Sequence, residues 1–100
     1  MGRAKAAIVA FSSRINDVDW SPNFKISNVD KFETKMDPRD WIAIYTTAAR
    51  AANASEDLMT AYVPIKLGHD ALQWLRHLRR GAIEDWSDFC QLFISNFQSL

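Results

Sequence analysis

The residue types that could do chemistry gather in one stretch of the sequence, LGHDALQWLRHLRRGAIEDWSDFCQLF. It holds both histidines, several aspartates and the only cysteine, so a Cys/His/Asp catalytic site is the first hypothesis. A nucleophilic cysteine needs a lowered pKa, which an exposed electropositive setting supplies. Cys90 instead falls on an apolar helical stripe between Phe89 and Phe93, where burial would raise its pKa. We therefore expect a buried structural thiol at this position.

The histidines and aspartates of this stretch also have structural explanations. His69 and His77 are eight residues apart, whereas two metal ligands on one helix face need a spacing of four. Asp70, Asp85 and Asp88 stand where helices would start, so their carboxylates are expected to cap helix N-termini. No CxxC or Cys/His spacing suggests zinc. The sequence predicts that the chain is not an enzyme, and that it has no catalytic residue, metal site, cofactor or small-molecule substrate.

Helix signals are dense from Asp37 onward. Asp37 is placed to cap a first helix that begins at Pro38. Asn53, which tolerates left-handed backbone, is placed to stop it. Ser55 starts a second helix, which Pro64 should kink or end early.

Three further signals divide the rest of the chain. Gly68 closes the second helix. Asp70, with Gln73 three residues later, gives the capping-box pattern of a third helix, which Gly81 ends. Asp85 starts the fourth helix.

Each of these helices carries one apolar stripe at helical spacing. The stripes consist of Trp41, Tyr45, Ala48, Ala49 and Ala52; of Leu58, Tyr62 and Ile65; of Ala71, Trp74, Leu75 and Leu78; and of Trp86, Phe89, Cys90, Phe93 and Phe97. Four stripes joined by short links predict an all-α fold, a compact bundle of about four to five helices over residues 37–100.

Residues 1–36 lack a sustained helical period and are expected to form an extended arm that packs on the helical body. Pro22 favours extended backbone at the residue before it, and FKISNV is compatible with a short strand. The arm carries the irregularly spaced aromatics Phe11, Trp20, Phe24 and Phe32. Two interpretations stay open: these rings complete the core, or arm and helices border an apolar groove that takes an extended peptide.

Charge argues against an independent nucleic-acid binder. Twelve basic and twelve acidic residues give a formal net charge of +0, whereas such binders usually carry a large positive excess. Arg76, Arg79 and Arg80 gather at the end of the third predicted helix. They either complement that helix C-terminus or contact an acidic partner, such as RNA, a phosphate-bearing small molecule or a protein's carboxylates. These charges are too few for strong RNA binding by this segment alone.

The expected compartment is the cytoplasm, with the nucleus as the alternative. One cysteine cannot form an internal disulfide, and the apolar run in MGRAKAAIVAF is too short for a signal peptide. Myristoylation at Gly2 is not expected because position 6 is Ala rather than Ser or Thr. No stretch approaches the ~20 apolar residues of a membrane span.

A longer pattern emerges from the strings WSPNFK, KFETKMDPRDWIAIYTTAARAA, AYVPIKLGHDALQWL and RRGAIEDWSDFCQLFISNFQ. Their order and spacing resemble the Gag polyprotein of plant gypsy-type LTR retrotransposons. The resemblance spans about residues 18–98. The residues that match the family pattern are Phe32, Asp37, Pro38, Trp41, Pro64, Leu67, Ala71, Trp74, Leu75, Gly81, Ile83, Trp86, Phe89, Phe93 and Phe97.

The resemblance implies the N-terminal lobe of a capsid protein, with the helical lobe over 37–100. The same lobe occurs in the Gag-derived protein Arc, where it binds short peptides in an apolar groove. A matching groove here would involve Trp41, Ala48 and Lys66, with the arm as its lid. The candidate groove residues are thus Trp20, Phe24, Phe32, Trp41, Tyr45, Ala48 and Lys66.

The sequence departs from the family pattern at three places. Thr34 replaces a glycine, Asn53-Ala54 replaces Gly-Gly, and Arg79-Arg80 replaces Pro-Pro and so creates the basic cluster. The implied function is non-enzymatic self-association into capsid-like assemblies. The alternative is a domesticated adaptor that binds a peptide or host protein through the groove. Both a segment of a longer Gag and a short host gene are compatible with the sequence.

Overall fold

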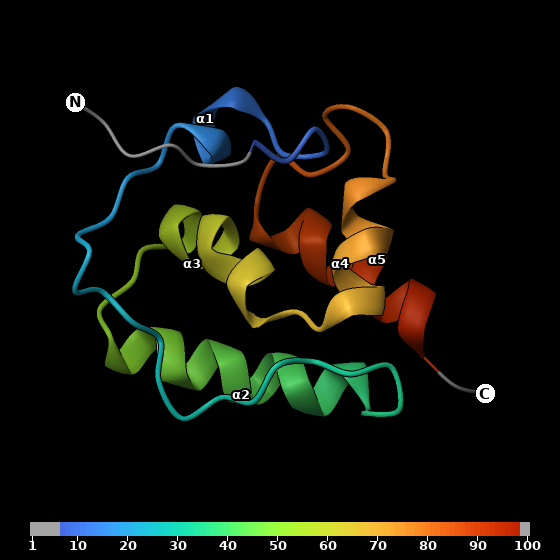
Figure 1. The fold of residues 1–100 in the computed structure, drawn as a ribbon, viewed down its shortest axis with the longest axis horizontal. Helices are drawn as coiled ribbons and strands as arrows, with labels where there is room; N and C mark the ends of the chain where they lie inside the picture. The colour runs from blue at the N-terminus through green and yellow to red at the C-terminus, as the bar shows by residue number, and fades with distance from the viewer. Residues whose placement is uncertain (1–6, 99–100) are drawn as a thin grey trace.

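The computed structural model describes residues 7–98, and the regular secondary structure in that range is helical. The helices are α1 (Ser13–Asn16), α2 (Pro38–Ala51), α3 (Glu56–Tyr62) with its 3₁₀ continuation η1 (Val63–Lys66), α4 (His69–Arg76) and α5 (Trp86–Phe97). Within the described residues there is no strand, only two isolated bridges. The predicted all-α bundle, preceded by a largely non-helical stretch, is confirmed (Figure 1).

Three predicted helix starts are confirmed by their caps. The side-chain oxygens of Asp37, Ser55 and Asp85 accept backbone N–H groups two or three residues further on, at 2.8, 3.1 and 2.9 Å. Asp88 reaches back and accepts the N–H of Glu84 at 3.0 Å. These bonds satisfy donors that helix N-termini otherwise leave unpaired.

The prediction for the third helix was wrong at both ends. Its N-cap is Gly68, without a side-chain bond, and Asp70 is an exposed first-turn residue. The Gly68 N–H donates to the carbonyl of Phe32 at 2.8 Å, which holds Gly68 extended and starts the helix at His69. The helix stops at Arg76, and Gly81 lies in the following loop with φ +74°.

The prediction made from Pro64 for the link between α3 and α4 is confirmed only in part. As predicted, α3 ends early, and Pro64 lies in η1. Ile65 was expected on the buried stripe but is 47% exposed. The tighter 3₁₀ turn has 3.0 rather than 3.6 residues per turn, so it rotates side chains away from an α-helical register. Asn53 has φ 61°, as its predicted role as a stop requires.

The N-terminal stretch differs from expectation in two details. FKISNV forms no strand among the described residues. Asn28 has φ 65°, which breaks extended geometry, and the buried Ile26 and Val29 are three apart rather than two. The one-turn helix α1 was not predicted. Ser12 caps it, and Arg14 Nη1 lies 2.6 Å from the carboxylate of Asp57 in α3.

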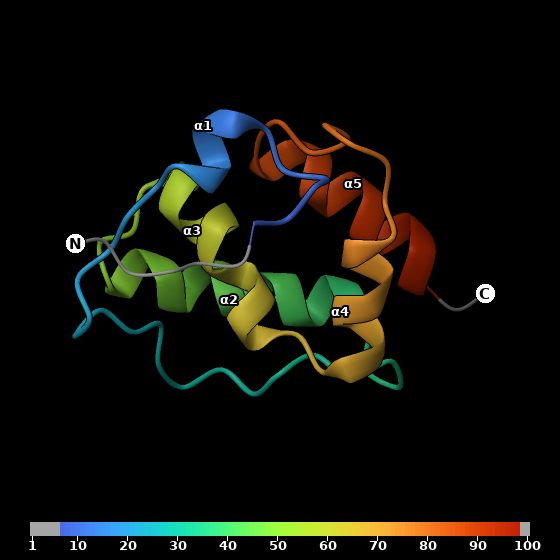
Figure 2. The same ribbon diagram turned by 45° about the horizontal axis from the view of Figure 1, so that its top comes forward.

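The core is an aromatic cluster to which α2, α4, α5 and the arm contribute. Phe93 is fully buried, with ring centroids 4.6 Å from Phe32, 5.6 Å from Trp41 and 5.9 Å from Trp74. Aromatic pairs at these separations stabilise a fold beyond the area they bury. Both α2 and α3 pack on α5, which carries Phe93 into this cluster. Figures 1 and 2 show the arrangement of the helices.

Two short backbone pairings attach the arm to the body. Near its start, Ser12 N–H donates to Ile83 at 2.9 Å, and Ile83 N–H donates to Ala10 at 2.8 Å. Near its end, Phe32 N–H donates to Lys66 at 2.8 Å. Between these points the chain forms α1 and then crosses to α2, and its later part runs alongside that helix (Figure 1).

Within residues 7–98, no helix has the length and apolar character needed to cross a membrane. Gly2 and Ala6, on which the myristoylation expectation depends, lie outside the described residues, as does the start of the rejected signal peptide.

Candidate functional site

Cys90 lies half-buried on α5. Burial raises the pKa of its thiol to about 11, and the nearby Glu56 carboxylate adds to the rise. At neutral pH the group is therefore a thiol and a poor nucleophile. The raised pKa is as predicted, although the side chain is half-buried rather than buried.

The other candidate chemical groups are dispersed. His77 Nδ1 lies 2.7 Å from the Gln73 carbonyl of its own helix, and Asp85 and Asp88 are engaged at the start of α5. Among the described residues no group of three His, Cys, Asp or Glu side chains is arranged to hold a metal ion. That the chain is not an enzyme stays a prediction.

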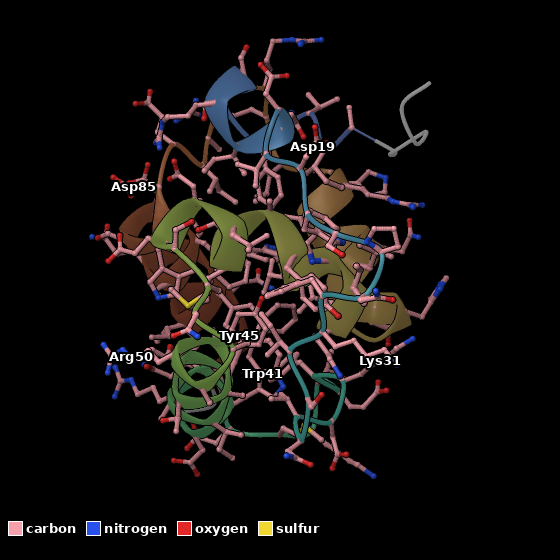
Figure 3. All side chains as sticks on the ribbon, turned by 90° about the vertical axis from the view of Figure 1, so that its left-hand side faces the viewer. Asp19, Lys31, Trp41, Tyr45, Arg50 and Asp85 are labelled. Atoms are coloured by element: carbon pink, nitrogen blue, oxygen red, sulfur yellow. The ribbon has the colours of Figure 1, made fainter. Side chains whose placement is uncertain are left out.

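Three of the candidate groove residues lie in the core. Phe32, Trp41 and Tyr45 are buried, and the rings of Trp41 and Tyr45 stack at 5.0 Å. The Trp41 Nε1–H donates to the Asp30 carbonyl at 2.8 Å. Figure 3 shows Trp41 and Tyr45 directed from α2 toward the body, while Arg50 points outward. Phe32 and Tyr45 thus support a surface from beneath, whereas Trp41 also lines a hollow beside α2.

The other groove candidates are divided among three places. Trp20 and Phe24 are half-buried and both meet Tyr62 edge-on, at 5.5 and 5.3 Å. Lys66 Nζ donates to the Val29 carbonyl at 3.1 Å, so its ammonium fastens the arm. Ala48 lies on the outer side of α2. The structure does not bring the seven residues together around one hollow.

A different surface stands out, which we call the outer face of α2: Ala43, Ile44, Thr47, Ala48 and Ala51. Ile44 is 54% exposed and lies at its middle. From position 41 to 49 the helix carries no charged residue. The Thr47 hydroxyl already donates to the Ala43 carbonyl at 2.9 Å. An exposed helix face normally carries charged and polar residues, so this uncharged face is unusual for a solvent boundary.

Two shallow hollows flank Ile44, between α2 and the arm. One, of about 630 Å³, extends toward the C-terminal end of α2 and includes Lys25. The other, of about 410 Å³, extends toward the N-terminal end and includes Asp30 and Asp40. Asn28 and Ile44 line both, so the hollows are continuous. The resulting groove is apolar at its centre, basic at one end and acidic at the other.

Two residues of these hollows, Trp41 and Ala48, were predicted as groove residues. Ile44, Lys25 and Asp30 were not predicted, although one signal was available. The uncharged interval from 41 to 49 contains more apolar residues than a single buried stripe requires. The excess positions are those that now form the outer face. No signal in the sequence indicated that the arm would line the groove, because this depends on how the arm is attached to the body.

The basic cluster is exposed. Arg76 ends α4, and Arg79 and Arg80 follow in the loop before Gly81.

Comparisons of the chain with known protein families, with characterised proteins and with solved structures give no match. The Gag resemblance therefore rests on the sequence motifs alone.

Proposed function

We propose that the chain is a non-enzymatic protein-interaction domain of the Gag capsid N-terminal type, and that it self-associates through the outer face of α2. One observation carries the proposal. The exposed side of a 14-residue helix has no charged residue between Asp40 and Arg50, and an isoleucine that is 54% exposed lies at its centre. Exposed apolar patches on small proteins mark contact surfaces.

The ends of the groove support a second copy of the chain as the partner. In a two-fold dimer, a surface patch meets the same patch turned around. An antiparallel contact centred on Ile44 would place the Lys25 end of one copy against the Asp30 and Asp40 end of the other. It would also place the two α2 dipoles antiparallel, which is favourable.

The size of the surface predicts weak association. A helix of 14 residues is roughly 21 Å long at about 1.5 Å per residue. Stable interfaces bury about 800 Å² per partner, more than one helix face supplies. We therefore expect a concentration-dependent dimer, of the kind that needs several contacts to build a larger assembly.

Light scattering coupled to size exclusion, across a wide concentration range, tests self-association. The mass should grow with concentration in the wild type and stay monomeric in Ile44→Lys. Ile65→Lys is the matched control, because Ile65 is also exposed but lies on η1. If Ile65→Lys abolishes association and Ile44→Lys does not, the outer face of α2 is the wrong surface.

A charge exchange tests the antiparallel arrangement separately. Lys25→Glu and Asp30→Lys should each weaken association, since each places like charges together at both ends of the contact. The double variant should restore it, because the opposite charges meet again. Additive loss in the double variant would contradict the arrangement while leaving self-association intact.

The alternative function is an adaptor that binds a peptide or host protein. The continuous groove between the arm and α2 favours it, since two hollows of about 630 and 410 Å³ could hold an extended segment. A wild-type chain that stays monomeric at every concentration would overturn self-association. Selection of peptides from a displayed library would then test the adaptor, which requires that Ile44→Lys abolish their binding.

A further inference from the structure

A third hollow lies on other elements of the fold. It is formed by the chain around α1, by α3 and η1, and by α4, and has a volume of about 440 Å³. α1 packs on α3, and α3 continues into η1 (Figure 2). The hollow falls within the range of sites that hold small molecules. Its lining is mainly apolar and includes Ile8, Phe11, Ile15, Trp20, Ile65 and Leu72.

Two polar side chains of the lining, Asn16 and Arg76, differ in their ability to hydrogen-bond a ligand. The Asn16 side chain accepts the N–H of Ile8 at 3.1 Å and donates to the carbonyls of Ile8 and Phe11 at 2.9 and 3.2 Å. Its amide is therefore engaged in holding the loop before α1. Among the lining residues that the structure describes, Arg76 is the one with a charged side chain, and no carboxylate within residues 7–98 pairs with it. A planar guanidinium presents donors in the geometry that a carboxylate matches.

We propose that this hollow binds a small amphipathic carboxylate, with its alkyl chain against the apolar wall and its carboxylate on Arg76. Transfer of the alkyl chain from water to the apolar lining lowers the free energy of the complex. Ile65 is 47% exposed at this site, and such a ligand would cover it. The site lies away from the outer face of α2 and does not depend on self-association.

The composition of the lining favours an alkyl carboxylate over a peptide. A peptide carries a polar amide at every residue, and each amide placed against an apolar wall loses its hydrogen bonds to water. An alkyl chain carries no such groups. One cation beside an apolar wall therefore matches a ligand with one charged end.

Isothermal titration calorimetry with three probes of equal chain length tests the proposal. The probes are decanoate and decylammonium, each kept below its micelle concentration, and decanol, kept below its solubility limit. Decanoate should bind, decanol should bind roughly tenfold more weakly because it lacks the charge-assisted bond, and decylammonium should not bind measurably. Amide NMR shifts on adding decanoate should centre on Ile65, Leu72 and Arg76.

Two arginine variants separate the site from general charge effects. Arg76→Gln should bind decanoate no better than decanol, whereas Arg79→Gln should keep the wild-type preference because Arg79 lies outside the lining. Both side chains are exposed, so neither change should impair folding. Equal binding of the three probes, or an unchanged preference in Arg76→Gln, would overturn the proposal. Tighter binding of a short peptide that ends in leucine, again dependent on Arg76, would overturn the small-molecule assignment.

Discussion

The Tyr45 hydroxyl donates a 2.7 Å hydrogen bond to the carbonyl oxygen of Met59, and this bond joins α2 to α3 inside the core. The Tyr45 ring stacks on Trp41 at 5.0 Å and lies 5.6 Å from Trp86 of α5. One side chain thus connects three helices and fixes the orientation of α2. The same orientation turns Ile44 outward.

Tyr45→Phe should lower the free energy of unfolding by about 1–3 kcal/mol, because it leaves the buried Met59 carbonyl without its partner. Urea denaturation measures the change. Tyr62→Phe is the matched control, since Tyr62 is also buried but its hydroxyl has no hydrogen-bond partner within residues 7–98. Equal losses in the two variants would mean that the Tyr45–Met59 bond adds no stability.

Stability should also fall at alkaline pH because of Tyr45. Burial raises the pKa of its phenol well above the ordinary value, and Tyr62 adds to the rise. The unfolded chain releases this proton above about pH 10, whereas the folded chain keeps it. The stabilisation is therefore complete below about pH 10 and declines by about 1.4 kcal/mol per pH unit above it.

This pH dependence is best measured in a Cys90→Ser background, because the raised thiol pKa adds a similar slope. In that background, the free energy of unfolding between pH 10 and 11 should fall more steeply than when Tyr45→Phe is added. Parallel curves would contradict the assignment to Tyr45.

Cys90 should react slowly with iodoacetamide. A thiol pKa of about 11, against an ordinary value near 9, lowers the thiolate fraction at pH 8 about a hundredfold. A thiolate of higher pKa is also a stronger nucleophile, which offsets part of this loss. Labelling of the folded chain should therefore be roughly tenfold or more slower than labelling in denaturant. Comparable rates would place the thiol in an exposed setting that the described packing does not provide.

Two aspartates of similar sequence context should differ in their contribution to stability. Asp85→Ala should cost about 1 kcal/mol, because Asp85 caps α5 at 2.9 Å. Asp70→Ala should cost only about 0.3 kcal/mol, because Asp70 is an exposed first-turn residue without a capping bond. Thermal unfolding of the two variants compares them. A larger loss for Asp70→Ala would restore the original capping prediction.

Features that depend on neighbouring residues could be predicted from the sequence. Asp37 before Pro38 fixed the start of α2, and Asn53 fixed its end, because capping and left-handed backbone are local properties. Asp70 misled because the start of α4 depends on Phe32, far away in the sequence, whose carbonyl binds the Gly68 N–H. Nothing near Asp70 reports that contact.

The candidate surface was harder to predict than the fold. An aromatic side chain on an arm fits a core and a groove equally well, and the sequence cannot decide between them. The structure buries Phe32 and places Trp20 in the lining of the hollow that contains Arg76. The outer face of α2 was predictable in part, since the lack of charge around Ile44 is a local property. Its flanking hollows were not.

The contact of Arg14 with the backbone carbonyl of Glu84 has a consequence for synthesis. These residues are 70 positions apart in the chain. A ribosome that adds about 5–20 residues per second takes roughly 4–14 seconds to cover that distance. The pairing of Phe11 with Ile83 has to wait equally long. The start of the arm is thus made well before its docking site, whereas Phe32 at its end can pair once Lys66 is made. The apolar residues near the start of the arm are open to chaperones in the interval.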